Sequence, residues 1–137
     1  MNYNYLQRSH NKIYKRKNII YKFFKSPKKY FIERDFYLNS SKLNIDIIPK
    51  LYYFSDKRFC IIIENVGCHI TKKEFISNQE IIKELYNVIV SKTGYYHNDL
   101  YYKNVCKKNN NYYIIDFESA SHFYKDIHKK SKELYIN

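Results

Sequence analysis

The sequence contains no tryptophan, two glycines, two prolines, one methionine and three cysteines among its 137 residues. The cysteines are odd in number and lack Cys-x-x-Cys spacing, which argues against a disulfide framework and against a zinc site. We expect Cys60, Cys68 and Cys106 to be buried free thiols. No apolar run approaches the length of a membrane span, and the polar, basic start lacks a signal-peptide core. We therefore expect an intracellular, cytoplasmic protein with no membrane span.

Acidic residues are also scarce, and the first part of the chain has none. The sequence carries 25 Lys and Arg against 13 Asp and Glu, and residues 1–30 contain nine basic side chains and no acidic one. A basic surface attracts nucleotide phosphates or an acidic substrate, and it binds nucleic acid nonspecifically in a salt-dependent way. The interleaved tyrosines can stack on bases, but tyrosine is abundant throughout the chain. We therefore favour a solvated basic face over a dedicated nucleic-acid site.

Two short motifs near the carboxyl end carry the clearest chemical signal. The first is HNDLYYKN at residues 97–104, and the second is IIDFE at residues 114–118. Phosphoryl transfer requires carboxylate and amide groups held around a metal-bound triphosphate. Asp99, Asn104 and Asp116 supply groups of these types.

The local pattern brings these three side chains toward one place. Residues 112–115 form an apolar and aromatic run after a polar turn, which predicts a buried strand with residues 105–106 as its hairpin partner. This pairing places Asn104 and Asp116 at the open ends of two strands, close enough to offer oxygen to one hard cation. Asp99 precedes the hairpin, within reach of the same phosphate without being a metal ligand.

The two motifs resemble the catalytic loop and the metal-binding loop of the protein-kinase-like superfamily. The pattern H-x-D-L-x-x-x-N is complete, and D-F-E stands where protein kinases usually have D-F-G. The resemblance implies that Asp99 is the catalytic base and that Asn104 and Asp116 bind Mg²⁺. It further implies that His97 braces the loop, and that Lys103 stands where tyrosine kinases often carry a basic residue that meets the γ-phosphate. The spellings H-N-D-L and D-F-E are closer to choline and aminoglycoside phosphotransferases and to small atypical protein kinases than to typical protein kinases.

The resemblance also implies a phosphate-binding lysine on a strand and a helix glutamate that pairs with it. Residues 18–24 form a β-rich run with one internal lysine, Lys22, and this run resembles the V-A-I-K strand. Residues 28–42 have helical spacing, and Glu33 is placed there to pair with Lys22. Asp35 is the competing choice.

A connector for adenine is the third upstream feature that the family requires. Residues 48–54 and 58–64 have the composition of two strands, and the second ends in an apolar run. The segment from Glu64 to Val66 resembles the hinge whose backbone groups hydrogen-bond adenine. We therefore expect Glu64 and Val66 to contact the nucleotide.

Helix signals follow the predicted hinge. Capping-box patterns begin at Thr71 and at Ser77. The second pattern predicts a helix to about Lys92, with Gly94 as its stop. Residues 122–135 space their apolar side chains at helical intervals and predict a helix that closes the lower core. The apolar stripe of the longer helix comprises Ile81, Ile82, Leu85, Tyr86 and Ile89.

These elements predict an α+β fold, a single kinase-like domain over residues 1–137 with a miniature two-lobed architecture. Residues 1–66 would form the N-terminal lobe, an antiparallel sheet with one helix, together with the hinge. Residues 67–137 would form a shortened helical C-terminal lobe that carries the catalytic hairpin. The length of the chain leaves room for one modest core.

Two departures from the family pattern bear on function. The glycine-rich phosphate loop is missing, because the only glycines are Gly67 and Gly94, so residues 6–11 must cover the phosphates without that backbone freedom. The chain also ends soon after Asp116. We therefore expect either that a partner or a second copy binds the acceptor, or that the chain is a reduced relative.

The resemblance implies an ATP-dependent phosphotransferase that uses Mg²⁺, and we expect it to act on serine or threonine hydroxyls of a protein substrate or partner. One alternative is a small-molecule kinase of choline or aminoglycoside type, which the motif spellings favour and the missing acceptor subdomain opposes. A second alternative is a pseudokinase that binds and modulates a partner. The truncated lobe favours it, and the intact Asp99, Asn104 and Asp116 oppose it.

Overall fold

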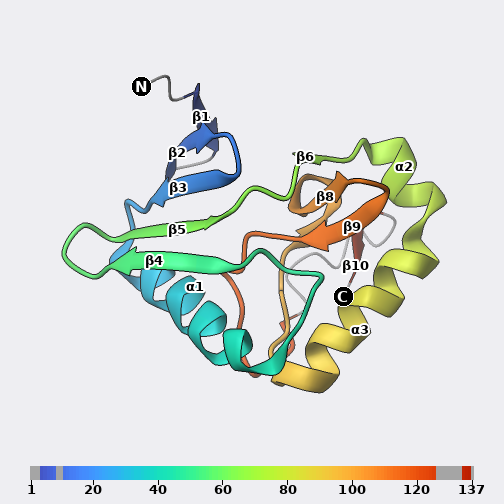
Figure 1. The fold of residues 1–137 in the computed structure, drawn as a ribbon. Helices are drawn as coiled ribbons and strands as arrows, with labels where there is room; N and C mark the ends of the chain where they lie inside the picture. The colour runs from blue at the N-terminus through green and yellow to red at the C-terminus, as the bar shows by residue number, and fades with distance from the viewer. Residues whose placement is uncertain (1–3, 9–10, 126–133, 137) are drawn as a thin grey trace.

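The computed structural model describes residues 4–8, 11–125 and 134–136. Its N-terminal part is a five-stranded sheet with the strand order β1-β2-β3-β5-β4, and every neighbouring pair is antiparallel (Figure 1). The strands are β1 (Asn4–Arg8), β2 (Asn11–Arg16), β3 (Ile19–Phe23), β4 (Leu51–Ser55) and β5 (Cys60–Glu64). The apolar run of β5 suits its place between two strands, because its side chains are covered along most of its length. The predicted N-terminal antiparallel sheet is confirmed.

Helix α1 (Pro27–Ser40) packs against this sheet (Figure 1). It begins where the sequence supplies a cap, because the Ser26 hydroxyl accepts a hydrogen bond from the backbone N–H of Lys29 at 3.2 Å and Pro27 occupies the first turn. A short 3₁₀ turn, η1 (Ser41–Leu43), continues it toward β4. The buried face of α1 carries Tyr30, Glu33, Phe36, Tyr37 and Ser40.

The C-terminal part combines two helices with two small sheets. The helices are α2 (Lys72–Ser77) and α3 (Gln79–Thr93), and α3 lies on the opposite side of the molecule from α1 (Figure 1). A three-stranded sheet has the order β6-β8-β9, and a two-stranded one pairs β10 with β7. Their bounds are β6 (Cys68–His69), β7 (Leu100–Tyr101), β8 (Val105–Lys108), β9 (Asn111–Ile114) and β10 (Tyr135–Ile136), with the 3₁₀ turn η2 (Tyr102–Asn104) before β8. The predicted catalytic hairpin is therefore the β8–β9 pair.

Two of the predicted helix signals hold and one is wrong. The Thr71 hydroxyl accepts from the backbone N–H of Glu74 at 3.1 Å, and Gly94 ends α3 in the left-handed conformation with φ of 73°. Ser77 does not cap a helix, because it is the last residue of α2 and Asn78 takes the cap position of α3 without a side-chain hydrogen bond. The apolar stripe of α3 is narrower than predicted, since Ile81 is exposed.

The predicted C-terminal helix is also wrong where the structure describes it. Residues 122–125 are not helical, and Tyr135 lies in β10, where it pairs with Tyr101 of β7. Residues 126–133 lie outside the described part of the chain. Long-range strand pairing therefore overrides a helical spacing of apolar residues at this end.

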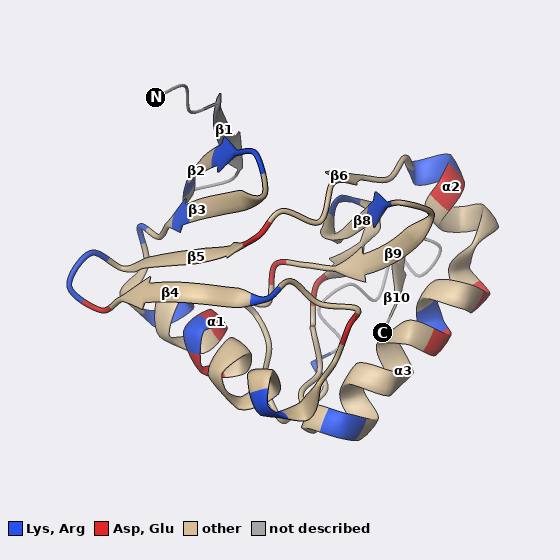
Figure 2. Cartoon of the chain, in the orientation of Figure 1, with Lys and Arg blue, Asp and Glu red and all other residues tan. Residues whose placement is uncertain are grey.

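One buried core connects the two parts. The rings of Phe36 on α1 and Phe117 stack with their centroids 3.8 Å apart, and the backbone N–H of Ile114 donates to the carbonyl of Ile47 at 2.8 Å. Charged side chains lie mostly outside this core, and Figure 2 shows Lys and Arg at the end of β2 and in the turn to β3. In the described residues no helix has the length and apolar character needed to cross a bilayer. The predicted α+β class is confirmed.

Candidate active site

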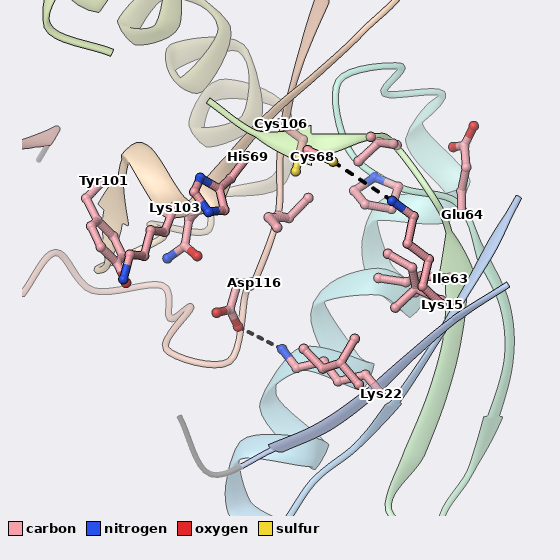
Figure 3. A pocket seen from close by; sticks show the side chains of 17 residues that line it. Lys15, Lys22, Ile63, Glu64, Cys68, His69, Tyr101, Lys103, Cys106 and Asp116 are labelled. Atoms are coloured by element: carbon pink, nitrogen blue, oxygen red, sulfur yellow. Dashed lines mark hydrogen bonds and ion pairs between the residues drawn. The ribbon is translucent and has the colours of Figure 1, made fainter. Parts of the chain in front are cut away.

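A cavity of about 580 Å³ lies between the two parts of the molecule. Side chains of β2, β3 and β5 line one side, and those of β6, β7, η2 and β8 line the other (Figure 3). Two predicted site residues do not line it: Glu33 lies behind Lys22, and Asp99 is half-buried on the segment before β7. The predicted residues that do line it are Lys22, Glu64, Val66, Lys103, Asn104 and Asp116.

Lys22 is the centre of a buried charge cluster. Its Nζ lies 2.6 Å from Oε1 of Glu33. It also lies 2.7 Å from Oδ1 of Asp116, and Figure 3 shows this second contact. Among the described basic residues of positions 11–30, only Lys22 is buried, which distinguishes it from the solvated lysines around it. Burial alone lowers the pKa of a lysine, but the neighbouring carboxylates outweigh it and raise the pKa of Lys22, so this residue is an ammonium.

Glu33 has the geometry of the predicted partner, and Asp35 does not. The Glu33 side chain is 1% exposed, and its second carboxylate oxygen accepts a hydrogen bond from the backbone N–H of Phe117. Burial raises the pKa of Glu33, and the ammonium of Lys22 opposes that shift. Asp35 points to solvent on the other face of α1, where Arg34 binds it at 2.6 Å. Glu33 thus connects β3 to the segment that carries Asp116.

His97 fixes the segment between α3 and β7. Its ring is 1% exposed, Nε2 lies 2.7 Å from the Ile115 carbonyl, and Nδ1 accepts from the backbone N–H of Asp99 at 3.1 Å. A carbonyl can only accept, so we assign the proton to Nε2 and a neutral imidazole. Burial lowers the pKa of His97, which favours the same neutral form.

Asn104 and Asp116 flank the cavity from two neighbouring strand ends. Nδ2 of Asn104 donates to the Asp99 carbonyl at 2.8 Å, which leaves the amide oxygen of this buried side chain for another partner. The backbone of Asp116 is left-handed, with φ of 65°, a conformation that carboxylate and amide residues tolerate better than others. The backbone N–H of Ile115 donates to the Asn104 carbonyl at 3.0 Å and so holds the two strand ends together.

The donor set fits Mg²⁺ as a partner that also takes ligands from a nucleotide. A carboxylate and an amide oxygen are hard ligands, and Mg²⁺ sites commonly combine one or two such protein groups with phosphate oxygens and water. In the described part of the chain, no group of three or more His, Cys, Asp and Glu side chains forms a self-sufficient metal site. Asn104 and Asp116 are therefore suited to a metal that takes its remaining ligands from a bound molecule and from water.

Lys103 lies on the opposite side of the cavity from Lys15 and Glu64 (Figure 3). Lys103 is exposed and lines the cavity beside Tyr101 (Figure 3). Burial raises the pKa of Tyr135 on β10, and the negative charge of Asp99 raises it further. Asp99 does not line the cavity, but its backbone carbonyl accepts a hydrogen bond from Asn104, which does line it, at 2.8 Å.

The predicted hinge connects the two parts at the end of β5. The backbone N–H of Asn65 donates to the Asn18 carbonyl at 2.8 Å, and the Asn65 side chain accepts from the N–H of Gly67 at 3.1 Å. Gly67 has φ of 94°, and a Cβ atom there would lie 2.5 Å from the Lys107 carbonyl oxygen, so only glycine fits. Val66 is 2% exposed, and within the described residues neither its N–H nor its carbonyl forms a hydrogen bond. Val66 lines the cavity.

Several residues of the site were not predicted from the sequence. Cys68 is exposed on the cavity wall, contrary to the expectation of three buried thiols, and Lys15 Nζ lies 4.0 Å from its sulfur. Glu118, the third residue of the D-F-E motif, lies 3.6 Å from Lys22 Nζ and accepts from the Asn11 amide at 2.8 Å. The departure from D-F-G was the one sequence signal that marked this position.

Solved structures share this fold, although neither a protein-family model nor a curated protein matches the sequence. A choline/ethanolamine kinase family protein from Mesorhizobium loti superposes with a TM-score of 0.63 at 9% identity, over 88% of this chain and 59% of that protein. WbdD, in a co-crystal structure with the kinase inhibitor LY294002, superposes with a TM-score of 0.59 at 15% identity, over 85% of this chain and 32% of WbdD. This chain spans less than two thirds of either neighbour. The two-part arrangement around one cavity, together with these matches, shows that the chain has the protein-kinase-like fold.

Proposed function

We propose that the chain is an ATP-dependent phosphotransferase that transfers the γ-phosphate of Mg·ATP to a hydroxyl group. The observation that carries this proposal is the buried contact of Lys22 with Glu33 and Asp116 at the wall of one cavity, at 2.6 and 2.7 Å. Burial and the two carboxylates fix the orientation and the positive charge of Lys22. A lysine that binds a triphosphate needs both properties.

Each predicted residue has a role in this proposal. Lys22, oriented by Glu33, contacts the α- and β-phosphates, and the backbone of the hinge from Glu64 to Val66 binds adenine. Asn104 and Asp116 hold Mg²⁺, which when bound neutralises charge on the phosphate oxygens.

The chemical step of this proposal involves Asp99 and Lys103. Asp99 orients the acceptor hydroxyl and accepts its proton while the hydroxyl oxygen forms a bond to the γ-phosphorus. The bond from that phosphorus to the β–γ bridging oxygen breaks, and ADP leaves. Lys103 offsets negative charge on the γ-phosphate during the transfer.

A serine or threonine of a protein is the acceptor that we propose first. In this proposal the nucleotide occupies the cavity beside Lys22. Asp99 is half-buried and does not line that cavity, so the acceptor approaches it from outside and can be presented by a large partner. A small-molecule acceptor of amino-alcohol type is the second candidate. The match to a choline/ethanolamine kinase family protein and the D-F-E spelling support it.

Transfer of label from γ-³²P-ATP tests the proposal. The purified protein is incubated with Mg²⁺ and, in separate reactions, with a panel of Ser/Thr-containing proteins, a panel of amino alcohols and a panel of aminoglycosides. We expect label in the protein panel, and an Asp99→Asn variant should lose about 10²-fold or more of the rate while it still binds ATP. Label only in a small-molecule panel would identify the second candidate. No consumption of ATP in any reaction, or equal rates with the variant, would contradict the proposal.

A further inference from the structure

A hydrogen bond joins the start of β2 to the segment that follows β9. Nδ2 of Asn11, the first residue of β2, donates to Oε2 of Glu118 at 2.8 Å, across 107 positions of sequence. Asn11 is 6% exposed, and the Glu118 side chain is 12% exposed. Neither residue lines the cavity, so this bond is not part of the surface that a nucleotide touches.

Glu118 also contacts two lysines of the N-terminal part. Its Oε2 lies 3.6 Å from Nζ of Lys22, and its Oε1 lies 3.6 Å from Nζ of Lys29 on α1. The carboxylate therefore lies between β2, β3 and α1. Only Lys29 among these three partners is substantially exposed, so the contacts with Asn11 and Lys22 are largely removed from solvent.

Three consecutive residues of the metal-binding segment are each attached to a different part of the N-terminal lobe. Asp116 binds Lys22 on β3, the backbone of Phe117 binds Glu33 on α1, and Glu118 binds Asn11 on β2. The first two contacts belong to the site described above. The third contact, from Glu118 to Asn11, reaches β2. Other residues of this strand, such as Lys15, line the cavity.

We propose that Asn11 and Glu118 are positioning residues that hold β2 and the Asp116 segment in the relative position that Mg·ATP requires. This inference rests on the proposed function. A glycine at position 118 would have no side chain to reach β2, so the contact exists because Glu118 replaces the motif glycine. The bond fixes the start of β2 by a side chain, in a chain whose only glycines are Gly67 and Gly94.

A double-mutant cycle on ATP affinity tests this inference. The variants are Asn11→Ala, Glu118→Ala and the double variant, and dissociation constants for Mg·ATP are measured by calorimetry at a temperature where circular dichroism shows each protein folded. Asn11→Ala should bind ATP about tenfold more weakly, the effect of one lost buried hydrogen bond. Glu118→Ala should bind at least as weakly, because it also loses the contacts with Lys22 and Lys29. The double variant should bind no more weakly than Glu118→Ala, because that change alone already removes the contact with Asn11.

Two controls separate positioning from general stability. Glu118→Gln keeps an oxygen that can accept from Asn11 and should bind ATP nearly as the parent does. Phe75→Leu trims a buried ring of α2, away from the cavity, and should lower the melting temperature without weakening ATP binding. Strictly additive losses in the double variant, or parent-like binding by Glu118→Ala, would overturn the inference while leaving the proposed function intact. A parent protein that binds no ATP would overturn both.

Discussion

Lys22 and Glu33 form a buried ion pair with Nζ and Oε1 2.6 Å apart, at the point where the central strand of the sheet meets α1. Removing either partner would leave an uncompensated charge in the interior, which is strongly unfavourable. The pair is nevertheless accessible from the cavity, because Lys22 is one of the residues that line it. Lys22 also binds Asp116. Lys22 is therefore oriented by Glu33 on one side and can donate to a ligand in the cavity on the other. Because carboxylates surround this lysine, an anionic ligand also needs the positive charge of a metal ion.

Replacing Lys22 by methionine should greatly reduce ATP affinity. The Lys22→Met variant keeps the shape of the side chain and loses a charge-assisted contact of about 1.5–3 kcal/mol, so we expect binding to weaken by about 10- to 100-fold. Titration with a fluorescent ATP analogue measures this. Lys28→Met removes an exposed lysine of the same lobe and serves as the matched control. Equal weakening by both variants would mean that only the overall basic charge matters.

Cys68 offers a test of the site that does not depend on catalysis. It is the exposed thiol on the cavity wall, whereas Cys60 and Cys106 are buried, and burial raises the pKa of Cys60 to about 11. Iodoacetamide should therefore modify Cys68 first. Mg·ATP at about ten times its dissociation constant should slow this reaction about tenfold, as mass action requires for an occluded thiol.

Mass spectrometry of the tryptic peptides follows each cysteine separately. A Cys68→Ser variant controls for labelling of the two buried thiols. If ATP leaves the alkylation rate of Cys68 unchanged, the nucleotide does not occupy this wall of the cavity.

The sequence patterns that succeeded depend on residues close together in the chain. The β-rich run around Lys22 and the helical spacing around Glu33 predicted two elements, and the structure pairs these residues. Thr71 caps α2 because its hydroxyl needs only the next turn, and Gly94 ends α3 for a similarly local reason.

The patterns that failed depend on distant partners. The apolar residues before Tyr135 have helical spacing in the sequence, but Tyr135 pairs with Tyr101 in a strand. Local sequence carries no information about a partner so distant in the chain. The Asn11–Glu118 contact crosses 107 positions, and although the D-F-E spelling marked Glu118, nothing in the sequence indicated that Asn11 is its partner. Ser77 matches a capping box, but it is the last residue of α2. Because α3 begins two residues later, Asn78 takes the cap position of α3 instead.

His97 should make stability depend on pH. Burial lowers the pKa of folded His97 below its usual value of 6.5, so the unfolded chain binds the proton more tightly. Stability is therefore complete above pH 6.5 and decreases as the pH falls toward the lower folded-state pKa. Urea unfolding at a series of pH values between 8 and 5 measures this slope.

The His97→Asn variant isolates the contribution of this imidazole. It loses hydrogen bonds to the Ile115 carbonyl and the Asp99 N–H, so its free energy of unfolding should be lower by about 1–3 kcal/mol at pH 8. The decrease of stability between pH 7 and 5 should be shallower than in the parent, because the buried titrating group is gone. An unchanged slope would show that other groups cause the acid sensitivity.

The most direct test of the account is the melting temperature with and without Mg·ATP, in the parent and in an Asp116→Asn variant. Asparagine tolerates the left-handed backbone of position 116, so the variant removes the charge without straining the chain. At about 100 times the dissociation constant, Mg·ATP should add about 2.7 kcal/mol to the stability of the parent and raise its melting temperature by several degrees. EDTA and the variant should each abolish most of this shift. A parent protein whose melting temperature does not respond to Mg·ATP, or a variant that responds as fully as the parent, would contradict the account.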